Sequence, residues 1–500
     1  MEPTFAAQLA ARDLAVVWHP CTQMHDHETL PMLPIARAEG AWLYGHDGRR
    51  WLDAVSSWWT CLLGHRHPRI VAALKDQLDR LDHVMLAGFT HQPAIELAEE
   101  LVRIAPKVAR PPASGGVIPA TAGIHWPSAR DGDVDARTHD AEVPSERRRS
   151  AAQDASSLSR VFYADNGSSA VEVALKLSFH YWKNQGRGER RRFVALTGGY
   201  HGETLGALSV TDVALYRETY APLLLEPIFA PSPDAYAADP GESAADCAGR
   251  ALRALRAILE RQAREVSAVI VEPLVQCAAG MRMYDASYLT GLRALCDEFD
   301  VHLIADEIAV GFGRTGTLFA CEQGGIVPDF LCLSKGLTGG TLPLSAVLTT
   351  AAIYAAFYAD YAAGKAFLHS HSYTGNPIAC RAALATLSVL REEPVLERNR
   401  ALAAHLAARL APLAAHPHVA DVRQTGMIAA IELVRDKITR EPFPAAERRG
   451  LRVYRHGLER GAVLRPLGNV VYFMPPYCIT PEEINFMVEV AAEGIERAVA

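Results

Sequence analysis

The stretch Asp329-Phe-Leu-Cys-Leu-Ser-Lys335-Gly-Leu337 decides the fold that the sequence leads us to expect. Its apolar run, 330–333, predicts a short buried strand that delivers Lys335 into a Ser-Lys-Gly turn. Lysine is seldom fully buried without a partner, so a lysine at the end of a core strand is expected to react with a ligand or to hold an anion.

The preceding strand carries a matching carboxylate. The run His302-Leu-Ile-Ala-Asp-Glu-Ile308 repeats the apolar pattern and places Asp306 at its exit. Pyridoxal phosphate (PLP) requires a carboxylate for its pyridinium nitrogen and an amine for a Schiff base. Asp306 and Lys335 together therefore predict a PLP site.

Around these two strands, short apolar runs alternate with helical patterns. Strands are expected at 161–164, 193–196, 268–271 and 344–348, and helices at 168–182, 248–266 and 286–300. This alternation indicates an α/β fold with a mostly parallel central sheet and helices on both faces. Ligands of such sheets bind at the carboxyl ends of the strands, where Asp306, Lys335 and Tyr200 fall.

Residues 107–159 interrupt the alternation. They are rich in Pro, Gly, Ala, Ser and charged residues and show little periodicity, which predicts a disordered surface insertion. The insertion separates a helix ending near Ile104 from the strand that begins at Val161. From about residue 393 the chain is rich in Ala, Leu and Arg, which suits a second, smaller domain.

Composition excludes several classes of partner. The net charge of -7 over 500 residues is mild and gives no reason to expect nucleic acid or an anionic membrane. No apolar run approaches the ~18 residues of a membrane span, and the N-terminus lacks a signal-peptide pattern. Nine cysteines without a Cys-x-x-Cys pair argue against disulfides and structural zinc. We expect a cytoplasmic, reduced protein.

A candidate anion site lies in Asn166-Gly-Ser-Ser-Ala-Val-Glu172, between a strand and a helix. Gly167 permits close approach of an anion, and the helix N-terminus presents free N–H groups, so a phosphate suits this place. The alternative is a helix cap, with Ser168 or Ser169 capping and Glu172 completing a box-like turn. The two roles are compatible.

Aromatic residues could bind a planar cofactor or an aliphatic substrate. Tyr200, between glycines at a strand end, could stack on the cofactor or belong to the core. Of the tandem Trp58 and Trp59, one could line a substrate site while the other packs in the core.

Two other kinds of motif suggest chemistry other than PLP catalysis, but each is a weaker signal than the Asp306 and Lys335 pair. The stretch Gly311-Phe-Gly-Arg-Thr-Gly316 matches a dinucleotide fingerprint, which leaves an NAD(P)-dependent dehydrogenase as an alternative. Acidic residues separate it from the strand, so we expect Arg314 to serve a carboxylate or a buried acid instead. The His-x-His pairs 25/27, 65/67 and 369/371 lack further ligands at metal-binding spacing, and no metal is expected.

These motifs, in this order, resemble the class III aminotransferases of PLP fold type I over nearly all the chain except 107–159. Five further stretches narrow the resemblance to one group of members within this family: Trp18-His-Pro20, Ser56–Trp59, Gly64–Pro68, Met281–Tyr284 and Arg465–Pro476. They point to the members that convert 8-amino-7-oxononanoate to 7,8-diaminononanoate in biotin biosynthesis, with S-adenosylmethionine as amino donor. The resemblance implies an N-terminal segment 1–62, a large PLP-binding domain 63–392 and a small domain 393–500.

The resemblance also implies residue roles. Lys335 would bond PLP and move protons, Asp306 would keep the pyridine nitrogen protonated, and Tyr200 and Ile308 would pack on the two ring faces. The phosphate would be held by Gly167, Ser168 and, from a second subunit, Ser372, which implies a homodimer with shared sites. Arg465 would bind the acceptor's carboxylate in a pocket completed by Trp58, Trp59, Arg314, Gly336, Cys21 and Glu203. Exchange of substrates in one pocket implies ping-pong kinetics.

Three positions depart from the family pattern. Cys21 stands where a tyrosine is usual, Glu203 where an aspartate is common, and Ser372 where threonine is usual. The first two bear on the donor, so lysine as donor and another ω-aminotransferase acting on a diamine or β-amino acid stay open. A PLP-fold protein without activity is a further alternative.

Overall fold

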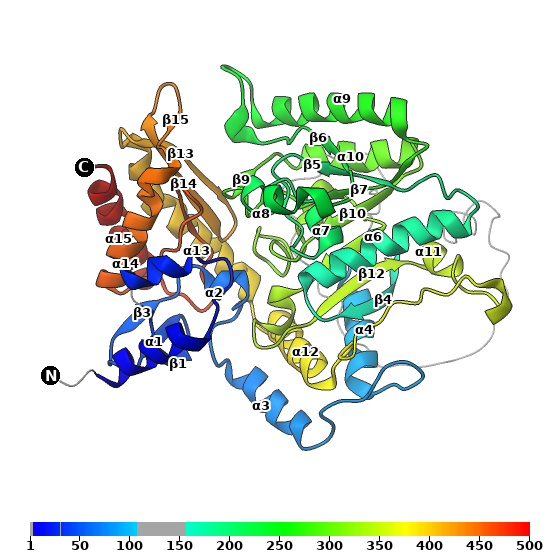
Figure 1. The fold of residues 1–500 in the computed structure, drawn as a ribbon, viewed down its shortest axis with the longest axis horizontal. Helices are drawn as coiled ribbons and strands as arrows, with labels where there is room; N and C mark the ends of the chain where they lie inside the picture. The colour runs from blue at the N-terminus through cyan, green and yellow to red at the C-terminus, as the bar shows by residue number, and fades with distance from the viewer. Residues whose placement is uncertain (1–3, 31, 108–156) are drawn as a thin grey trace.

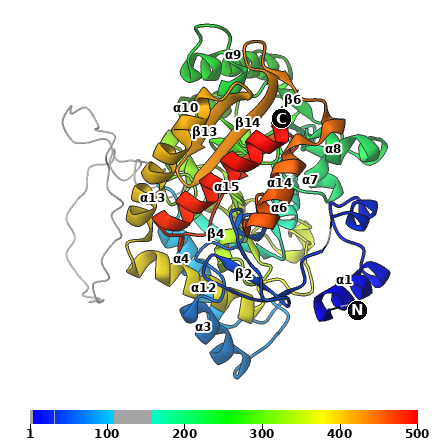
Figure 2. The same ribbon diagram turned by 90° about the vertical axis from the view of Figure 1, so that its left-hand side faces the viewer.

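The computed structural model describes residues 4–30, 32–107 and 157–500 (Figures 1 and 2). Most of the insertion predicted at 107–159 lies outside the described residues. Its last two residues, Leu158 and Ser159, do not belong to an insertion, because they begin strand β4 (Leu158–Ala164). The predicted helix ending near Ile104 is confirmed as α4 (Gln92–Ile104).

A seven-stranded sheet forms the centre of the molecule (Figure 1). Its order is β4, β12 (Ser345–Thr350), β11 (Phe330–Leu333), β10 (His302–Asp306), β7 (Val266–Val271), β5 (Arg192–Leu196) and β6 (Ile228–Ala230). β10 pairs in parallel with β11 and β7, and β5 pairs in parallel with β7 and β6, whereas β12 is antiparallel to both neighbours. The predicted α/β fold with a mostly parallel sheet is therefore confirmed.

Both faces of this sheet are buried, which explains the continuous apolar runs. In β11, Phe330 and Cys332 belong to the core on one face, and Leu331 and Leu333 belong to the core on the other. Helix α6 (Gly167–Asn184) packs on the first face. The second is covered by α4, α9 (Ala244–Gln262), α10 (Ser287–Glu298) and α12 (Pro377–Glu392). A parallel sheet buried on both faces needs apolar residues at every position.

Short elements surround the sheet. They are α3 (Pro68–Leu78), α7 (Leu205–Ser209), α8 (Ala214–Arg217), α11 (Ala351–Ala355) and the hairpin β8 (Val275–Gln276) and β9 (Arg282–Met283). Among the described residues, no helix is both long and apolar enough to cross a membrane.

The N-terminal and C-terminal parts of the chain lie side by side, at the left of Figure 1. The C-terminal sheet contains β13 (Val419–Thr425), β14 (Ile428–Asp436), β15 (Glu441–Pro442) and β16 (Val470–Phe473), with α13 (Val395–Leu410), α14 (Arg449–Arg460) and α15 (Pro481–Val499). The N-terminal part has α1 (Phe5–Val16), β1 (Ile35–Glu39), β2 (Trp42–Gly45), β3 (Arg50–Leu52) and α2 (Ser56–Trp59). Leu52 N–H donates to the Gly461 carbonyl and joins the two parts. The domain boundaries at 62 and 392 stay a prediction.

Candidate active site

A cavity of about 600 Å³ opens at the carboxyl ends of the parallel strands. Asp306 ends β10, Glu272 follows β7, and Lys335 follows β11 after one intervening residue. All three line the cavity. Strands running in the same direction bring their carboxyl ends to one edge of the sheet, which is why residues far apart in sequence meet there.

Lys335 lies in a tight turn. Its φ of 44° lies in the left-handed region, and the preceding Ser334 hydroxyl donates to the Leu344 carbonyl at 2.8 Å. The Lys335 Nζ lies 4.9 Å from the centre of the Trp59 ring. Burial lowers the pKa of Lys335, although Asp306 opposes this shift. The lowered pKa favours a neutral amine, the form that can act as a base.

Asp306 is fixed by two contacts at its carboxylate. One oxygen accepts the Ile308 N–H at 3.1 Å, and the other lies 2.8 Å from His201 Nδ1. The backbone N–H of His201 donates to the Thr211 hydroxyl at 2.9 Å. Sequence reasoning did not assign a role to His201, although its position beside Tyr200 at the end of β5 was the available signal.

Glu272 is a second buried carboxylate at the cavity. Its two oxygens accept the N–H groups of Tyr200 at 2.9 Å and Cys277 at 3.0 Å. Burial raises the pKa of Glu272 to about 7. Glu272 therefore anchors the backbone that carries Tyr200. Its place directly after a core strand, like that of Asp306, could have indicated a cavity position.

The raised pKa of Glu272 predicts a change of stability with pH. Its usual pKa is 4.5, and in the folded state it is about 7, so the folded protein binds the extra proton between these values. Stability from this group is present below the unfolded pKa and is lost as the pH rises toward 7. We expect the wild-type advantage over Glu272→Gln in unfolding free energy to shrink from pH 5 to pH 8. Denaturant unfolding of both apoproteins measures it; an advantage that grows with pH contradicts the assignment.

Tyr200, Glu203 and Cys21 form one polar wall of the cavity. The Tyr200 hydroxyl donates to Glu203 Oε1 at 2.9 Å, and the Cys21 thiol lies 3.7 Å from the same oxygen. Burial and the Glu203 carboxylate raise the pKa of Tyr200, so its phenol stays protonated. The Tyr216 ring, which sequence reasoning missed, lies 5.3 Å from the Tyr200 ring and also lines the cavity.

Trp58 and Trp59 both line the cavity from an unusual turn. The four residues of α2, Ser56 to Trp59, have φ values of 49°, 45°, 71° and 72°. For residues other than glycine, this left-handed conformation costs roughly 1–2 kcal/mol each. Asp53 holds the turn by accepting the Ser57 N–H at 2.9 Å and the Ser57 hydroxyl at 2.7 Å. Trp59 is buried and donates to the Tyr472 hydroxyl, whereas Trp58 is 38 % exposed.

The candidate anion site lies where the sequence placed it, but its cap is different. Asn166 caps α6 by accepting the Ser169 N–H at 3.0 Å, so the expectation that Ser168 or Ser169 caps the helix was wrong. Gly167 packs against Ile308, because a Cβ at Gly167 would lie 2.9 Å from Ile308 Cγ2. Gly167, Ser168 and Ile308 all line the cavity.

Four of the expected site residues do not line the cavity. Arg465 lies over Trp58, with its guanidinium 4.6 Å from the ring centre. Arg314 is 1 % exposed and donates to the Pro475 carbonyl, and no acidic side chain pairs with it among the residues that the structure describes. Its role toward a carboxylate stays a prediction. Gly336 is buried, and Ser372 is exposed.

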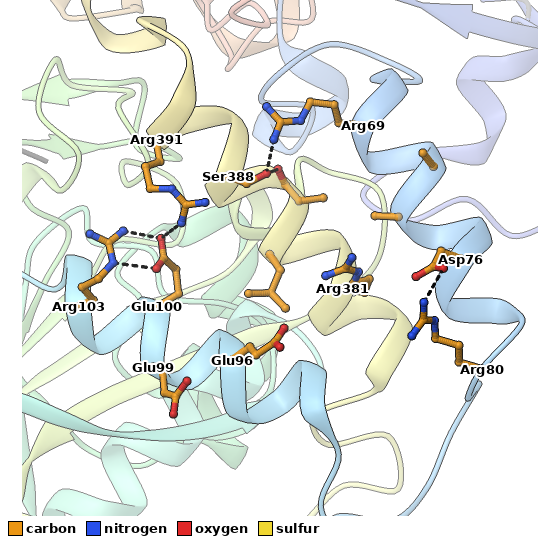
Figure 3. A pocket seen from close by; sticks show the side chains of 14 residues that line it. Arg69, Asp76, Arg80, Glu96, Glu99, Glu100, Arg103, Arg381, Ser388 and Arg391 are labelled. Atoms are coloured by element: carbon orange, nitrogen blue, oxygen red, sulfur yellow. Dashed lines mark hydrogen bonds and ion pairs between the residues drawn. The ribbon is translucent and has the colours of Figure 1, made fainter. Parts of the chain in front are cut away.

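A second depression, of about 940 Å³, lies between α3, α4 and α12 (Figure 3). Several of its charged side chains pair with one another: Glu100 accepts from both Arg103 and Arg391, and Asp76 accepts from Arg80. Because no lysine lines this depression, the cavity that holds Lys335 is the candidate active site. In the part of the chain that the structure describes, no group of three His, Cys, Asp or Glu side chains could hold a metal ion.

The cavity has the donor set that PLP needs. Lys335 supplies an amine and Asp306 a buried carboxylate. The N-terminal turn of α6, where Gly167 and Ser168 line the cavity, supplies backbone N–H groups that suit an anion. These residues fit the cofactor.

The chain belongs to the class III aminotransferases, enzymes that depend on PLP. The family described as "Aminotransferase class-III" matches residues 23–123 and 140–495. The fold and the site agree with this assignment, and the alternative of an NAD(P)-dependent dehydrogenase was wrong.

Similar proteins carry a more specific name. The adenosylmethionine-8-amino-7-oxononanoate aminotransferase of Helicobacter pylori is 42 % identical, over 96 % of both chains. That of Geobacter sulfurreducens is 41 % identical, over 97 % of this chain and 95 % of its own.

Solved structures agree in fold. The crystal structure of adenosylmethionine-8-amino-7-oxononanoate aminotransferase from Methanocaldococcus jannaschii has a TM-score of 0.83 at 36 % identity and covers 98 % of this chain and 99 % of its own. The omega transaminase of Pseudomonas jessenii in complex with PMP has a TM-score of 0.84 at 27 % identity, with 98 % of each chain covered.

Proposed function

We propose that this enzyme transfers an amino group from S-adenosylmethionine to 8-amino-7-oxononanoate, giving 7,8-diaminononanoate for biotin biosynthesis. The observation that carries the proposal is the single cavity lined by Lys335, Asp306, Tyr200 and the tandem Trp58 and Trp59. Similarity to relatives of that name over nearly the whole chain supports the choice of substrates.

The chain's own side chains take distinct roles in this proposal. PLP, when bound, accepts the electron pair released at the substrate carbon. Asp306, fixed by His201 and the Ile308 N–H, holds a proton on the ring nitrogen. The Lys335 Nζ, whose pKa burial lowers, takes a proton from the substrate carbon and returns it. Tyr200 and Ile308, which line the cavity, would contact the ring, and Gly167 and Ser168 would hold the phosphate. Donor and acceptor use the same cavity in turn, which gives ping-pong kinetics.

Arg465 binds the acceptor's carboxylate in this proposal. It is stacked on Trp58, which lines the cavity, and has no acidic partner among the described residues. A charge-assisted hydrogen bond contributes about 1.5–3 kcal/mol, so Arg465→Ala should raise the KM for 8-amino-7-oxononanoate roughly 10–100-fold. Steady-state kinetics measure this, with the exposed Arg264→Ala as control. An acceptor without the carboxylate should be used equally by both enzymes; a loss of the same size for that acceptor argues against the assignment.

The donor is tested by direct comparison. Cys21 and Glu203 share a cavity wall with Tyr200, and an acidic wall suits a cationic amino donor. Both S-adenosylmethionine and lysine are cationic, so the names of the relatives support the choice between them. We expect the purified enzyme to form 7,8-diaminononanoate with S-adenosylmethionine and far more slowly with lysine. Turnover with lysine alone reassigns the donor, and no product with either donor overturns the proposed reaction.

We also propose a cytoplasmic homodimer in which Ser372 of each chain completes the partner's site. Ser372 is exposed, and the segment around it exposes Leu368 (91 %) and Tyr373 (63 %). Apolar side chains gathered on a surface favour an interface. All nine cysteines are free thiols, which suits a reducing compartment.

A further inference from the structure

Glu172 lies on α6, six positions after the capping residue Asn166, and has no role in the reaction described above. Its Oε1 atom accepts three hydrogen bonds: from the Thr204 hydroxyl at 2.7 Å, from Gly206 N–H at 2.7 Å and from Ala207 N–H at 3.1 Å. One carboxylate oxygen on α6 therefore holds the segment that follows Gly202, a cavity-lining residue from a different part of the chain.

Thr204 continues this connection to Ser168. The two hydroxyl oxygens lie 2.8 Å apart, and the Thr204 N–H donates to the Ser168 oxygen at 3.1 Å. A hydroxyl has one proton, and that of Thr204 is directed at Glu172, so the Ser168 hydroxyl is the donor to Thr204. The result is a directed chain from Ser168 through Thr204 to Glu172.

Close packing fixes the position of the first turns of α6 relative to the segment from Gly202 to Gly206. A Cβ at Gly202, where φ is +128°, would lie 2.4 Å from Ser168 Oγ, and a Cβ at Gly206 would lie 2.3 Å from Glu172 Oε2. Ser168, Gly202 and Glu203 all line the cavity. The Glu172 carboxylate thus sets how the first turn of α6 meets the loop that carries Glu203.

We propose that Glu172, acting through Thr204, is a positioning residue for the cofactor's phosphate. It touches neither ring nor substrate and aligns the Gly167–Ser168 turn, whose backbone N–H groups suit an anion. This inference deepens the PLP site and does not depend on which amino donor or acceptor the enzyme uses.

The test compares two ligands that differ only in the phosphate. The apoprotein is titrated with PLP and with pyridoxal, and the dissociation constants are read from cofactor absorbance. Glu172→Ala should weaken PLP binding about 10–100-fold, the loss expected for about 1.4–2.8 kcal/mol, and should change pyridoxal binding less than about 3-fold. Thr204→Val should shift the PLP constant in the same direction by a smaller factor.

Conservative replacement and a control make the result specific. Glu172→Gln retains the single oxygen that accepts all three bonds, so it should bind PLP within about 3-fold of wild type. The exposed Glu189→Gln should have no effect. Equal losses for PLP and pyridoxal in Glu172→Ala, or unchanged PLP binding in Thr204→Val and Glu172→Ala, overturn the proposal. If Glu172→Ala does not fold, Thr204→Val alone tests the proposal. Its loss of affinity for PLP is then compared with its loss of affinity for pyridoxal.

Discussion

Lys335→Ala is expected to lower transamination by about 10⁴-fold or more while leaving the protein folded. The general base contributes about 10²–10⁴-fold, and the same amine is the proposed attachment point for the cofactor. Because the replaced group is buried and burial disfavours its charged form, its removal should not lower the temperature of unfolding. Single-turnover and steady-state assays give the rate, and thermal unfolding of the apoprotein tests the fold.

A matched control separates catalysis from charge. Lys75 on α3 is exposed and makes no hydrogen bond or ion pair among the described residues, and Lys75→Ala should keep wild-type activity. Turnover of Lys335→Ala within tenfold of wild type contradicts the role given to Lys335.

Asp306→Asn is expected to lower turnover by about 10²–10³-fold, the size of effect seen when a preorganised electrostatic contact is lost. Asparagine can still accept the Ile308 N–H but carries no charge to hold a proton on the ring nitrogen. Cofactor binding should weaken less than turnover, because the proposed phosphate contacts lie on α6. Steady-state rates and the PLP dissociation constant measure the two effects.

Two comparisons sharpen this prediction. Asp306→Glu retains the charge and should recover part of the lost activity, and the exposed Asp79→Asn should behave as wild type. If Asp306→Asn loses activity and Asp306→Glu loses as much, the geometry at His201 matters more than the charge; wild-type turnover of Asp306→Asn contradicts the assigned role.

The central sheet could be predicted because its strands are buried on both faces. Phe330–Leu333 is apolar throughout and His302–Asp306 is apolar between its two end residues, and such short runs between helices leave few other folds. The predicted ends of helices were less accurate where a side-chain cap sets the end. The helix expected from 248 begins at Ala244, because Ser243 and Asp246 form a capping box.

Site residues that directly follow core strands could be predicted from the sequence. Site residues whose position depends on contacts elsewhere in the chain could not. Asp306, Lys335 and Tyr200 reach the cavity because strand ends converge. Nothing local in Ser56–Trp59 signals a left-handed turn, since it contains no glycine and depends on Asp53. Likewise, the burial of Arg314 against the Pro475 carbonyl depends on a contact 161 positions along the chain.

The central claim is that the Lys335 amine is the group to which PLP attaches. The measurement is to load the purified protein with PLP, treat it with borohydride to make a lysine–cofactor bond permanent, and locate the added mass by peptide mass spectrometry. We predict a single modified peptide, with the added mass on Lys335. Modification at another lysine with Lys335 unmodified, or no stable modification, would contradict the account.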